Sequence, residues 1–205
     1  MTRTFYDFHT HNPEPVSGVV KMVNIEPGAP SPKHDGIFYS SGVHPWRTAA
    51  AFNPALLQEM LPRLTAIGET GLDRLRGAPL PEQIKIFEQH LKYQMPLIIH
   101  NVRCTAEILH RLPNPVRTLW HRAPTKPSTL QQIIAAGSTV SFGQNELRHL
   151  DPTIVPLNRL GLETDDFDIP IDKVYQDAAE LWRIPIDQLT RQLQINFTNL
   201  YLSTL

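Results

Sequence analysis

Two histidines lie one residue apart near the N-terminus, directly after a mostly apolar run. If residues 5–9 form a strand, alternate side chains share one face, so Asp7, His9 and His11 point the same way. Two imidazoles on one face of a rigid strand make half of a metal site, and a carboxylate within reach can orient them. The remaining ligands of such a site must come from other parts of the chain.

Further imidazoles and carboxylates stand where other apolar, β-branched runs end. These runs cover residues 18–24, 37–43, 65–69, 96–100, 117–121, 138–142 and 160–165. The side chains at their ends are His44, Glu69, His100, His121 and Asp165. Several runs are apolar throughout, as strands of a parallel sheet buried on both faces should be. We therefore predict eight strands, most of which end in a group that can bind a metal ion.

Helix-like segments between the runs indicate the fold. They cover residues 53–64, 81–94, 104–112 and 128–136, and the tail 170–205 predicts two helices, the second beginning near Pro185. Alternation of strands and helices predicts an α/β protein, and eight strands point to a barrel. An open doubly wound sheet is the alternative architecture.

The first two crossovers differ from the rest. Residues 12–17 and 26–36 are rich in proline, glycine and serine and have no helical period, so they are expected to be loops. The predicted fold is therefore a compact, distorted TIM-like (β/α) barrel with its early crossover helices missing, formed by one domain over residues 1–205.

A barrel would bring the strand-end groups together, because the C-terminal ends of its strands share one rim. Imidazole nitrogen with carboxylate oxygen suits zinc, manganese or a similar ion, and the lack of clustered thiols argues against an iron–sulfur site. A bridging carboxylate can hold two ions roughly 3.5–4 Å apart, as in two-metal hydrolases. The sequence thus predicts hydrolysis by an activated water.

The composition of the chain limits which other functions and cellular locations are expected. Nineteen Lys and Arg against twenty Asp and Glu give a net charge of −1, so there is no global basic field for long nucleic acid. Cys104 is the only cysteine, which suggests a reducing compartment. The N-terminus does not resemble a signal peptide, and no stretch approaches the ~20 apolar residues of a membrane helix. We expect a cytoplasmic protein that is a monomer or weak oligomer and does not bind membranes.

Several motifs resemble one known family in type and order. They are Asp7–His11, Gly42–Trp46, Ile67–Asp73, Pro96–His100, Leu119–His121 and Leu162–Asp165, with Asn196–Phe197 near the C-terminus. The chain resembles the TatD-like metal-dependent hydrolases, which are distorted α/β barrels with one or two divalent metals, several of them deoxyribonucleases. The Gly-Glu-Thr-Gly-Leu-Asp and Glu-Thr-Asp blocks are the most specific; a His-x-His motif alone is shared with other metallohydrolases.

The resemblance implies a role for each strand-end group. One metal would be bound by His9, His11 and Asp165, the other by His100 and His121, and Glu69 would bridge them. Asp165 would also accept a proton from the attacking water, and His44 would contact a substrate phosphate. The implied cofactors are two divalent ions, either Zn, Mg or Mn.

Other residues are candidates for supporting roles. Asp7, Asp73 and Glu163 are expected to fix imidazole tautomers, with surface or loop salt bridges as the alternative. Trp46 is expected to stack on a base or to cover the barrel mouth. The family's arginine two residues after the fifth-strand histidine is absent here, so Arg103 is the nearest candidate for a phosphate contact.

The sixth-strand histidine also departs from the family, because Arg122-Ala123-Pro124 follows it where Cys-Phe and a small residue are usual. The other histidines, His34, His90, His110 and His149, are expected to face solvent.

Three functions fit these observations. The first is metal-dependent hydrolysis of a phosphodiester, in DNA or a nucleotide-like substrate. The second is hydrolysis of an amide, lactone or aminoacyl ester by the same activated water. The third is a catalytically idle barrel that acts as a binding module; its mark would be a lost metal ligand, and none is lost.

Overall fold

Eight parallel strands form one sheet in chain order in the computed structural model, which describes residues 3–47, 53–114 and 116–203. The strands are β1 (Phe5–Thr10), β2 (Val19–Ile25), β3 (Ile37–Ser41), β4 (Ala66–Asp73), β5 (Leu97–Val102), β6 (Thr118–Trp120), β7 (Thr139–Phe142) and β8 (Leu160–Leu162). Each pairs in parallel with the next. The sheet curves into a nearly closed barrel, which confirms the predicted fold.

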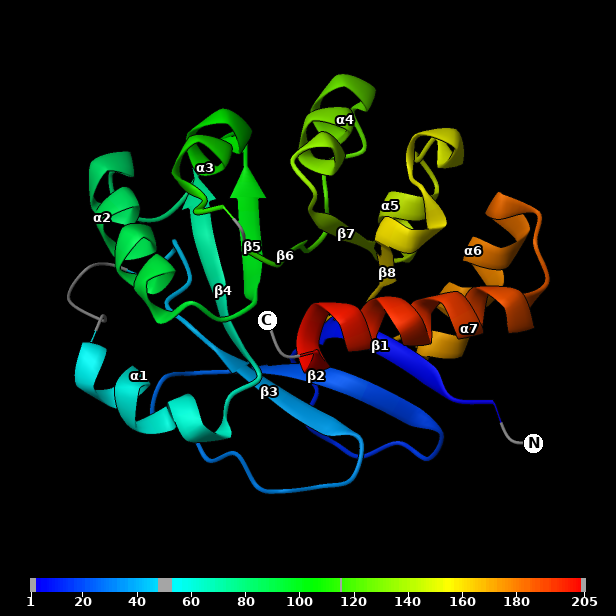
Figure 1. The fold of residues 1–205 in the computed structure, drawn as a ribbon, viewed down its shortest axis with the longest axis horizontal. Coiled ribbons are helices and arrows are strands. Elements are labelled where there is room, and N and C mark those ends of the chain that lie inside the picture. Colours follow the sequence, from blue (N-terminus) through cyan, green and yellow to red (C-terminus); the bar gives the residue numbers. More distant parts are fainter. Residues whose placement is uncertain (1–2, 48–52, 115, 204–205) are drawn as a thin grey trace.

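Helices cover the later crossovers and leave the first two as loops (Figure 1). They are α1 (Pro54–Met60), α2 (Leu80–His90), α3 (Thr105–Arg111), α4 (Pro127–Ala135), α5 (Gln144–Leu147), α6 (Ile171–Trp182) and α7 (Ile186–Phe197). Residues 11–18 and 26–36 contain neither helix nor strand, as predicted. In the part of the chain that is described, no helix is long and apolar enough to cross a membrane.

The C-terminal helix α7 covers strands that have no crossover helix of their own. The ring of Phe197 lies 5.4 Å from that of Tyr6, 5.3 Å from that of Phe8 and 5.9 Å from that of Phe38. Phe8 and Phe197 are fully buried. The side-chain amide of Asn196 donates to the carbonyls of Leu157, just before β8, and of Leu160, its first residue. The chain's last helix thereby supplies the apolar cover that the early loops cannot.

The barrel closes only at its C-terminal rim, where β8 meets β1. Just beyond β8, the Asp165 N–H donates to the His9 carbonyl at 3.0 Å, and the His11 N–H donates to the Asp165 carbonyl at 3.0 Å. Lower in the seam, the Tyr175 hydroxyl accepts from the Tyr6 N–H and donates to the Tyr6 carbonyl, each at 3.0 Å. The Tyr201 hydroxyl donates to the Phe8 carbonyl at 2.9 Å. Tyrosines from the outer layer thus satisfy the backbone of β1 that a closed sheet would otherwise pair.

The strand ends that differ most from the prediction are those of the fourth and eighth strands. The fourth strand continues to Asp73 because Gly71 lets it approach β5: a Cβ on Gly71, at φ 151°, would lie 1.9 Å from the His100 carbonyl oxygen. The eighth ends at Leu162 rather than 165, and Asp165 has a left-handed backbone at φ 53°. The short helix α5 was not predicted. Helices α6 and α7 match the predicted pair, and Pro185 is the N-cap of α7.

Candidate metal and active site

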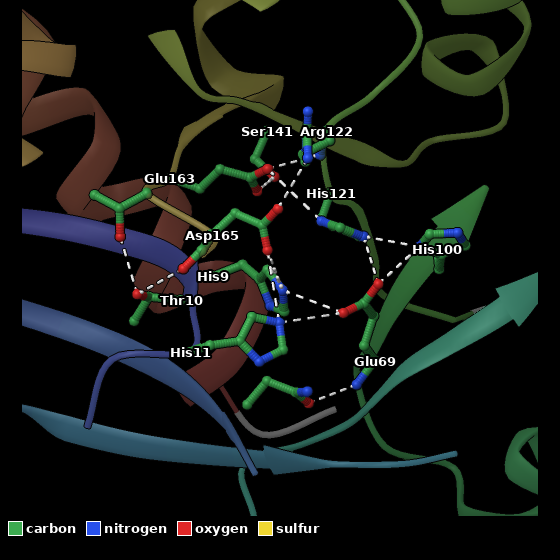
Figure 2. A network of polar contacts seen from close by, with 12 residues as sticks. His9, Thr10, His11, Glu69, His100, His121, Arg122, Ser141, Glu163 and Asp165 are labelled. Carbon is green, nitrogen blue, oxygen red and sulfur yellow. Dashed lines mark hydrogen bonds and ion pairs between the residues drawn. The ribbon is translucent and has the colours of Figure 1, made fainter. Parts of the chain in front are cut away.

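The predicted strand-end groups meet in one cluster at the C-terminal rim of the barrel. Figure 2 shows most of them converging around Glu69, namely His9, His11, His100, His121 and Asp165. The residues brought together are His9 and His11 from β1 and its end, His44 after β3, Glu69 on β4, His100 on β5, His121 after β6 and Asp165 after β8. Sequence separations of up to about 150 residues are thus reduced to neighbouring side chains, as the barrel topology requires.

One oxygen of Glu69 faces the first strand. Its Oε2 lies 3.6 Å from His9 Nε2 and 3.5 Å from His11 Nε2. The same two nitrogens lie 3.5 and 3.6 Å from Asp165 Oδ1. We call this group, consisting of His9, His11 and Asp165, the Oε2 side. It contains the ligand set that the resemblance implied for one metal.

The other oxygen of Glu69 faces three further imidazoles. Its Oε1 lies 2.7 Å from His100 Nδ1, 2.8 Å from His121 Nε2 and 3.1 Å from His44 Nε2. We call His44, His100 and His121 the Oε1 side. The position of His44 was not expected: its Nε2 lies at hydrogen-bond distance from both Glu69 Oε1 and His100 Nδ1, each 3.1 Å away, rather than only at the rim.

The backbone around Glu69 fixes this bridging position. A Cβ on Gly68, at φ 130°, would lie 2.5 Å from the Ile98 carbonyl oxygen, so only glycine fits there. The Glu69 N–H donates to the Asn24 side-chain oxygen at 2.6 Å. The carboxylate is buried, with 5% of its side chain exposed. The glycine-flanked motif therefore serves to seat one carboxylate between two groups of ligands.

Asp165 adopts an unusual backbone conformation. Its φ of 53° lies in the left-handed region, which costs a non-glycine residue energy and is typical of functional sites. Hydrogen bonds with β1 hold it there, and the Thr10 hydroxyl donates to its carbonyl at 3.1 Å. This conformation points its carboxylate at the two histidines of the N-terminal strand.

The two acids of the cluster are ionised. Burial alone would raise the pKa of Glu69, but the charge of His121 and the hydrogen bond to His100 outweigh it and hold that pKa well below its usual range. Burial also opposes ionisation of Asp165, yet its contact with His9 and the charge of His121 keep its pKa below the usual range. Both carboxylates are therefore available as anionic ligands at neutral pH.

The pKa values of the buried imidazoles shift in opposite directions. Burial and nearby His121 disfavour a charge on His9, but the contacts with Asp165 and Glu69 raise its pKa to about 9. Burial is likewise outweighed at His121, whose pKa is raised well above its usual value by the carboxylates. At His100 burial prevails and the pKa is lowered. Without a cation the cluster thus holds extra protons, and divalent metal binding should release them.

The donor set fits divalent metal ions. Three groups of side chains have ligand atoms within 4.8 Å of one another, namely His9/Glu69/His121, His9/His11/Asp165 and His44/Glu69/His100. Both ring nitrogens of His9 are buried and make no hydrogen bond with the described residues. A buried polar atom without a partner is costly unless a ligand completes it. These buried His, Glu and Asp groups can therefore bind metal ions of the kind that nitrogen and oxygen ligands prefer.

The predicted supporting carboxylates differ in what they touch. Asp73 Oδ2 lies 3.4 Å from His100 Nε2 and accepts from the Trp46 indole at 2.5 Å. Glu163 Oε1 lies 3.7 Å from His121 Nδ1. Asp7 instead accepts both hydrogen bonds from Thr164, and burial raises its pKa to about 7. Asp73 and Glu163 are in position to orient imidazoles, whereas Asp7 secures the turn that carries Asp165.

An open cavity of about 600 Å³ lies over the cluster. Its walls include Trp46, which is 47% exposed, and two arginines, Arg47 and Arg122. Arg103 is exposed and does not line this cavity; its carbonyl accepts from Arg74 at 3.2 Å. The geometry therefore does not support Arg103 as the phosphate contact. Arg122, which the sequence analysis noted only as a departure from the family pattern, lines the cavity instead.

One histidine expected at the surface is buried. His90, on α2, is fully inaccessible; its Nε2 accepts from the Val43 N–H at 3.0 Å and its Nδ1 pairs with the Ile86 carbonyl at 2.8 Å. Burial lowers its pKa to about 4. The other three histidines of that group are exposed, as predicted. The sequence did contain a signal, because position 90 is four residues after the apolar residue 86 on the buried face of α2.

The fold and site define a class. A parallel barrel with a carboxylate between two sets of histidines at its C-terminal rim has the architecture of metal-dependent hydrolases. The family model described as TatD related DNase matches residues 29–202, so the chain belongs to the TatD family. That match begins after the His-x-His motif, which the structure shows to be part of the same cluster. No curated protein matches the chain.

Solved structures share the fold over the whole length. The TatD homologue YjjV from Escherichia coli K12 is 22% identical with a TM-score of 0.82, and all of both chains is covered. A TatD family hydrolase from Entamoeba histolytica is 16% identical with a TM-score of 0.73, again over all of both chains. An uncharacterized amidohydrolase from Saccharomyces cerevisiae is 12% identical with a TM-score of 0.72, covering 97% of this chain and 100% of that one. At these identities the likeness establishes the fold.

Proposed function

We propose that this protein is a two-metal hydrolase that cleaves phosphodiester bonds. The observation that carries the proposal is the bridging position of Glu69, whose Oε2 faces His9 and His11 and whose Oε1 faces His100 and His121. A carboxylate in this position can hold two cations side by side. When bound, two divalent ions lower the pKa of a water and stabilise charge on a phosphate.

The chain's own residues supply the rest of the reaction. Asp165, ionised beside the histidines, accepts one proton from the attacking water. The water oxygen forms a bond to phosphorus, the bond from phosphorus to the leaving oxygen breaks, and the leaving oxygen takes up the proton that Asp165 had accepted. His44, 20% exposed in its side chain, contributes a ring at the open edge of the cluster, and His100 and His121 orient Glu69.

DNA or a nucleotide-like compound is the proposed substrate. The family match to TatD related DNase and the position of Arg122 on the cavity wall support an anionic phosphoester. The net charge of −1 favours short strands or 3′ ends over tracking of long duplexes.

The test combines metal analysis with a substrate panel. Elemental analysis should give up to two zinc or manganese ions per chain, and the loaded protein should hydrolyse a single-stranded oligonucleotide or bis(p-nitrophenyl) phosphate. Replacing Asp165 by Asn should remove that turnover. A protein with stoichiometric metal that cleaves p-nitroanilide amides but no phosphoester would overturn the phosphodiester assignment, and one that cleaves neither would favour a binding module.

A further inference from the structure

We infer that Arg122 selects substrates that carry a negative charge at the scissile bond, by donating to that charge while it holds Asp165. This inference rests on the proposed function and adds to it a specificity-determining residue. Arg122 directly follows His121 and lies on the cavity wall (Figure 2).

The backbone of Arg122 is locked in place. Its φ of 41° is left-handed, a conformation that a side chain of this size rarely adopts. Its N–H donates to Glu163 Oε1 at 2.7 Å. Glu163 is fully buried, and its other oxygen accepts from the Ser141 hydroxyl. Glu163 Oε1, which accepts from the Arg122 N–H, also lies 3.7 Å from His121 Nδ1, so one buried acid contacts both a cluster histidine and the backbone of the arginine.

The guanidinium is oriented from three directions. Its Nη1 lies 3.3 Å from Asp165 Oδ2, and its Nε donates to Glu146 Oε1 at 3.1 Å. Glu146 is itself positioned, because its Oε2 accepts from the Gly143 N–H at 3.1 Å. The Phe167 ring lies 5.0 Å from the guanidinium carbon and covers one face. A long side chain with 37% exposure is thus held in one place beside the base.

Donors remain available for a ligand. A guanidinium carries five N–H groups. Two are used in the contacts with Glu146 and Asp165, and within residues 3–47, 53–114 and 116–203 the other three have no hydrogen-bond partner. Planar N–H pairs suit phosphate oxygens in a way that a lysine does not. Because Asp165 Oδ1 faces the histidines while Oδ2 faces Arg122, an anion beside the guanidinium would also lie beside the base.

The matched comparison is Arg47, which lines the same cavity but pairs with exposed Glu26 at 2.6 Å and has no contact with Asp165. R122Q and R47Q remove the same charge from the same cavity. R122K keeps the charge but loses the planar fork. Thermal melting of each variant controls for folding.

Kinetics should separate the two arginines on two probes. With the metal-loaded protein, R122Q should lower kcat/KM for bis(p-nitrophenyl) phosphate by roughly 10- to 100-fold, mainly through KM, as loss of charge-assisted hydrogen bonds predicts. R122K should recover part of this. Hydrolysis of neutral p-nitrophenyl acetate should change by less than about threefold, and R47Q should have a much smaller effect on both probes. Equal losses on both probes with R122Q would show that Arg122 only positions Asp165 and would overturn the inference.

A binding measurement decides the matter independently of turnover. Calorimetric titration with diphenyl phosphate should show weaker binding to R122Q than to the wild type by a similar factor, with R47Q close to the wild type. Unchanged binding in R122Q would overturn the inference. If the wild type binds diphenyl phosphate through Arg122 but cleaves no phosphoester, the inference stands and the proposed function fails.

Discussion

The two sides of Glu69 are built by different means. On the Oε1 side two imidazoles have a buried carboxylate near the ring nitrogen that faces away from Glu69: Asp73 Oδ2 lies 3.4 Å from His100 Nε2, and Glu163 Oε1 lies 3.7 Å from His121 Nδ1. His44 differs, because its Nδ1 accepts from the Trp46 backbone N–H at 3.1 Å. On the Oε2 side the structure gives His9 no hydrogen bond at either ring nitrogen from the described residues, and the His11 side chain is 42% exposed.

The Oε2 side relies on the backbone instead. His9 lies on β1 and His11 directly follows it, and Asp165 is held by the strand-like hydrogen bonds that close the barrel. Outer partners fix the tautomer and orientation of ligating histidines and raise metal affinity. We therefore expect the Oε1 side to be the more organised before metal arrives, and the Oε2 side to be organised by the metal. In the proposed two-metal site, one bridging acid would thus join a group of histidines with outer carboxylates to a group without them.

The largest effect should come from the residue that both sides share. E69Q removes the bridging charge, so both sides should lose affinity by more than the roughly 10- to 100-fold typical of outer partners, and hydrolysis should fall below detection. Elemental analysis after dialysis gives the stoichiometry. Full retention of two metals would show that Glu69 does not bridge, and the division into two sides would be wrong.

A smaller loss of metal affinity should follow from replacing one outer carboxylate, Glu163. E163Q puts an amide where two donors, the Arg122 N–H and the Ser141 hydroxyl, now meet a buried carboxylate. Metal affinity should fall about 10- to 100-fold on the Oε1 side only. Competition with a chromophoric chelator measures the two affinities, and E107Q, a surface ion-pair change, is the control. Equal weakening on both sides would contradict the comparison.

The ligands themselves were the most predictable part of the site. Parallel strands bury apolar runs and bring the groups at their C-terminal ends to one rim, so the positions of His100 and His121 could be found from the runs that precede them. The loops that replace the first two crossovers were equally clear, because proline and glycine exclude a helix there. The bridging geometry of Glu69 followed from the family resemblance.

The groups that contact the histidines from outside the cluster were harder to predict. They depend on loops and on backbone conformations that no periodic sequence pattern marks. Arg122 has a left-handed backbone that no local pattern marks, and it lines the cavity where Arg103 was expected. The contact between Trp46 and Asp73 joins the loop after β3 to the end of β4, 27 residues away in the sequence. His90 was assigned to the surface because a lone histidine in a helix usually faces water, whereas here a backbone N–H inside the protein requires its ring.

Asp73 provides a finer test of the Oε1 side. D73N keeps the size of the side chain but weakens the acceptor shared by His100 and the Trp46 indole. Affinity on the Oε1 side should fall by about tenfold, near the lower end for an outer partner. W46F removes only the indole donor, and should therefore change metal affinity less than D73N. A W46F effect as large as that of D73N would show that the tryptophan, rather than the acid, braces His100.

The smallest effect concerns stability, through the histidine that supports the loop before His44. His90 has a pKa of about 4 in the folded protein, because it is buried, against roughly 6.5 in an unfolded chain. The unfolded chain therefore binds the proton more readily, and stability present above pH 6.5 is lost as the pH falls toward 4.

Between pH 7 and 5.5 this one group should lower the free energy of unfolding by about 1 kcal/mol. The pH dependence of urea unfolding should be shallower by that amount in H90Q, since glutamine does not titrate, and unchanged in H110Q, whose histidine is exposed. The wild type and both variants should be measured after metal has been removed with a chelator. Metal release at low pH then does not contribute to the change in the free energy of unfolding. If H90Q kept the wild-type slope, the Val43 contact would not depend on a neutral ring, and support of the Oε1 side by α2 would have to come from packing alone.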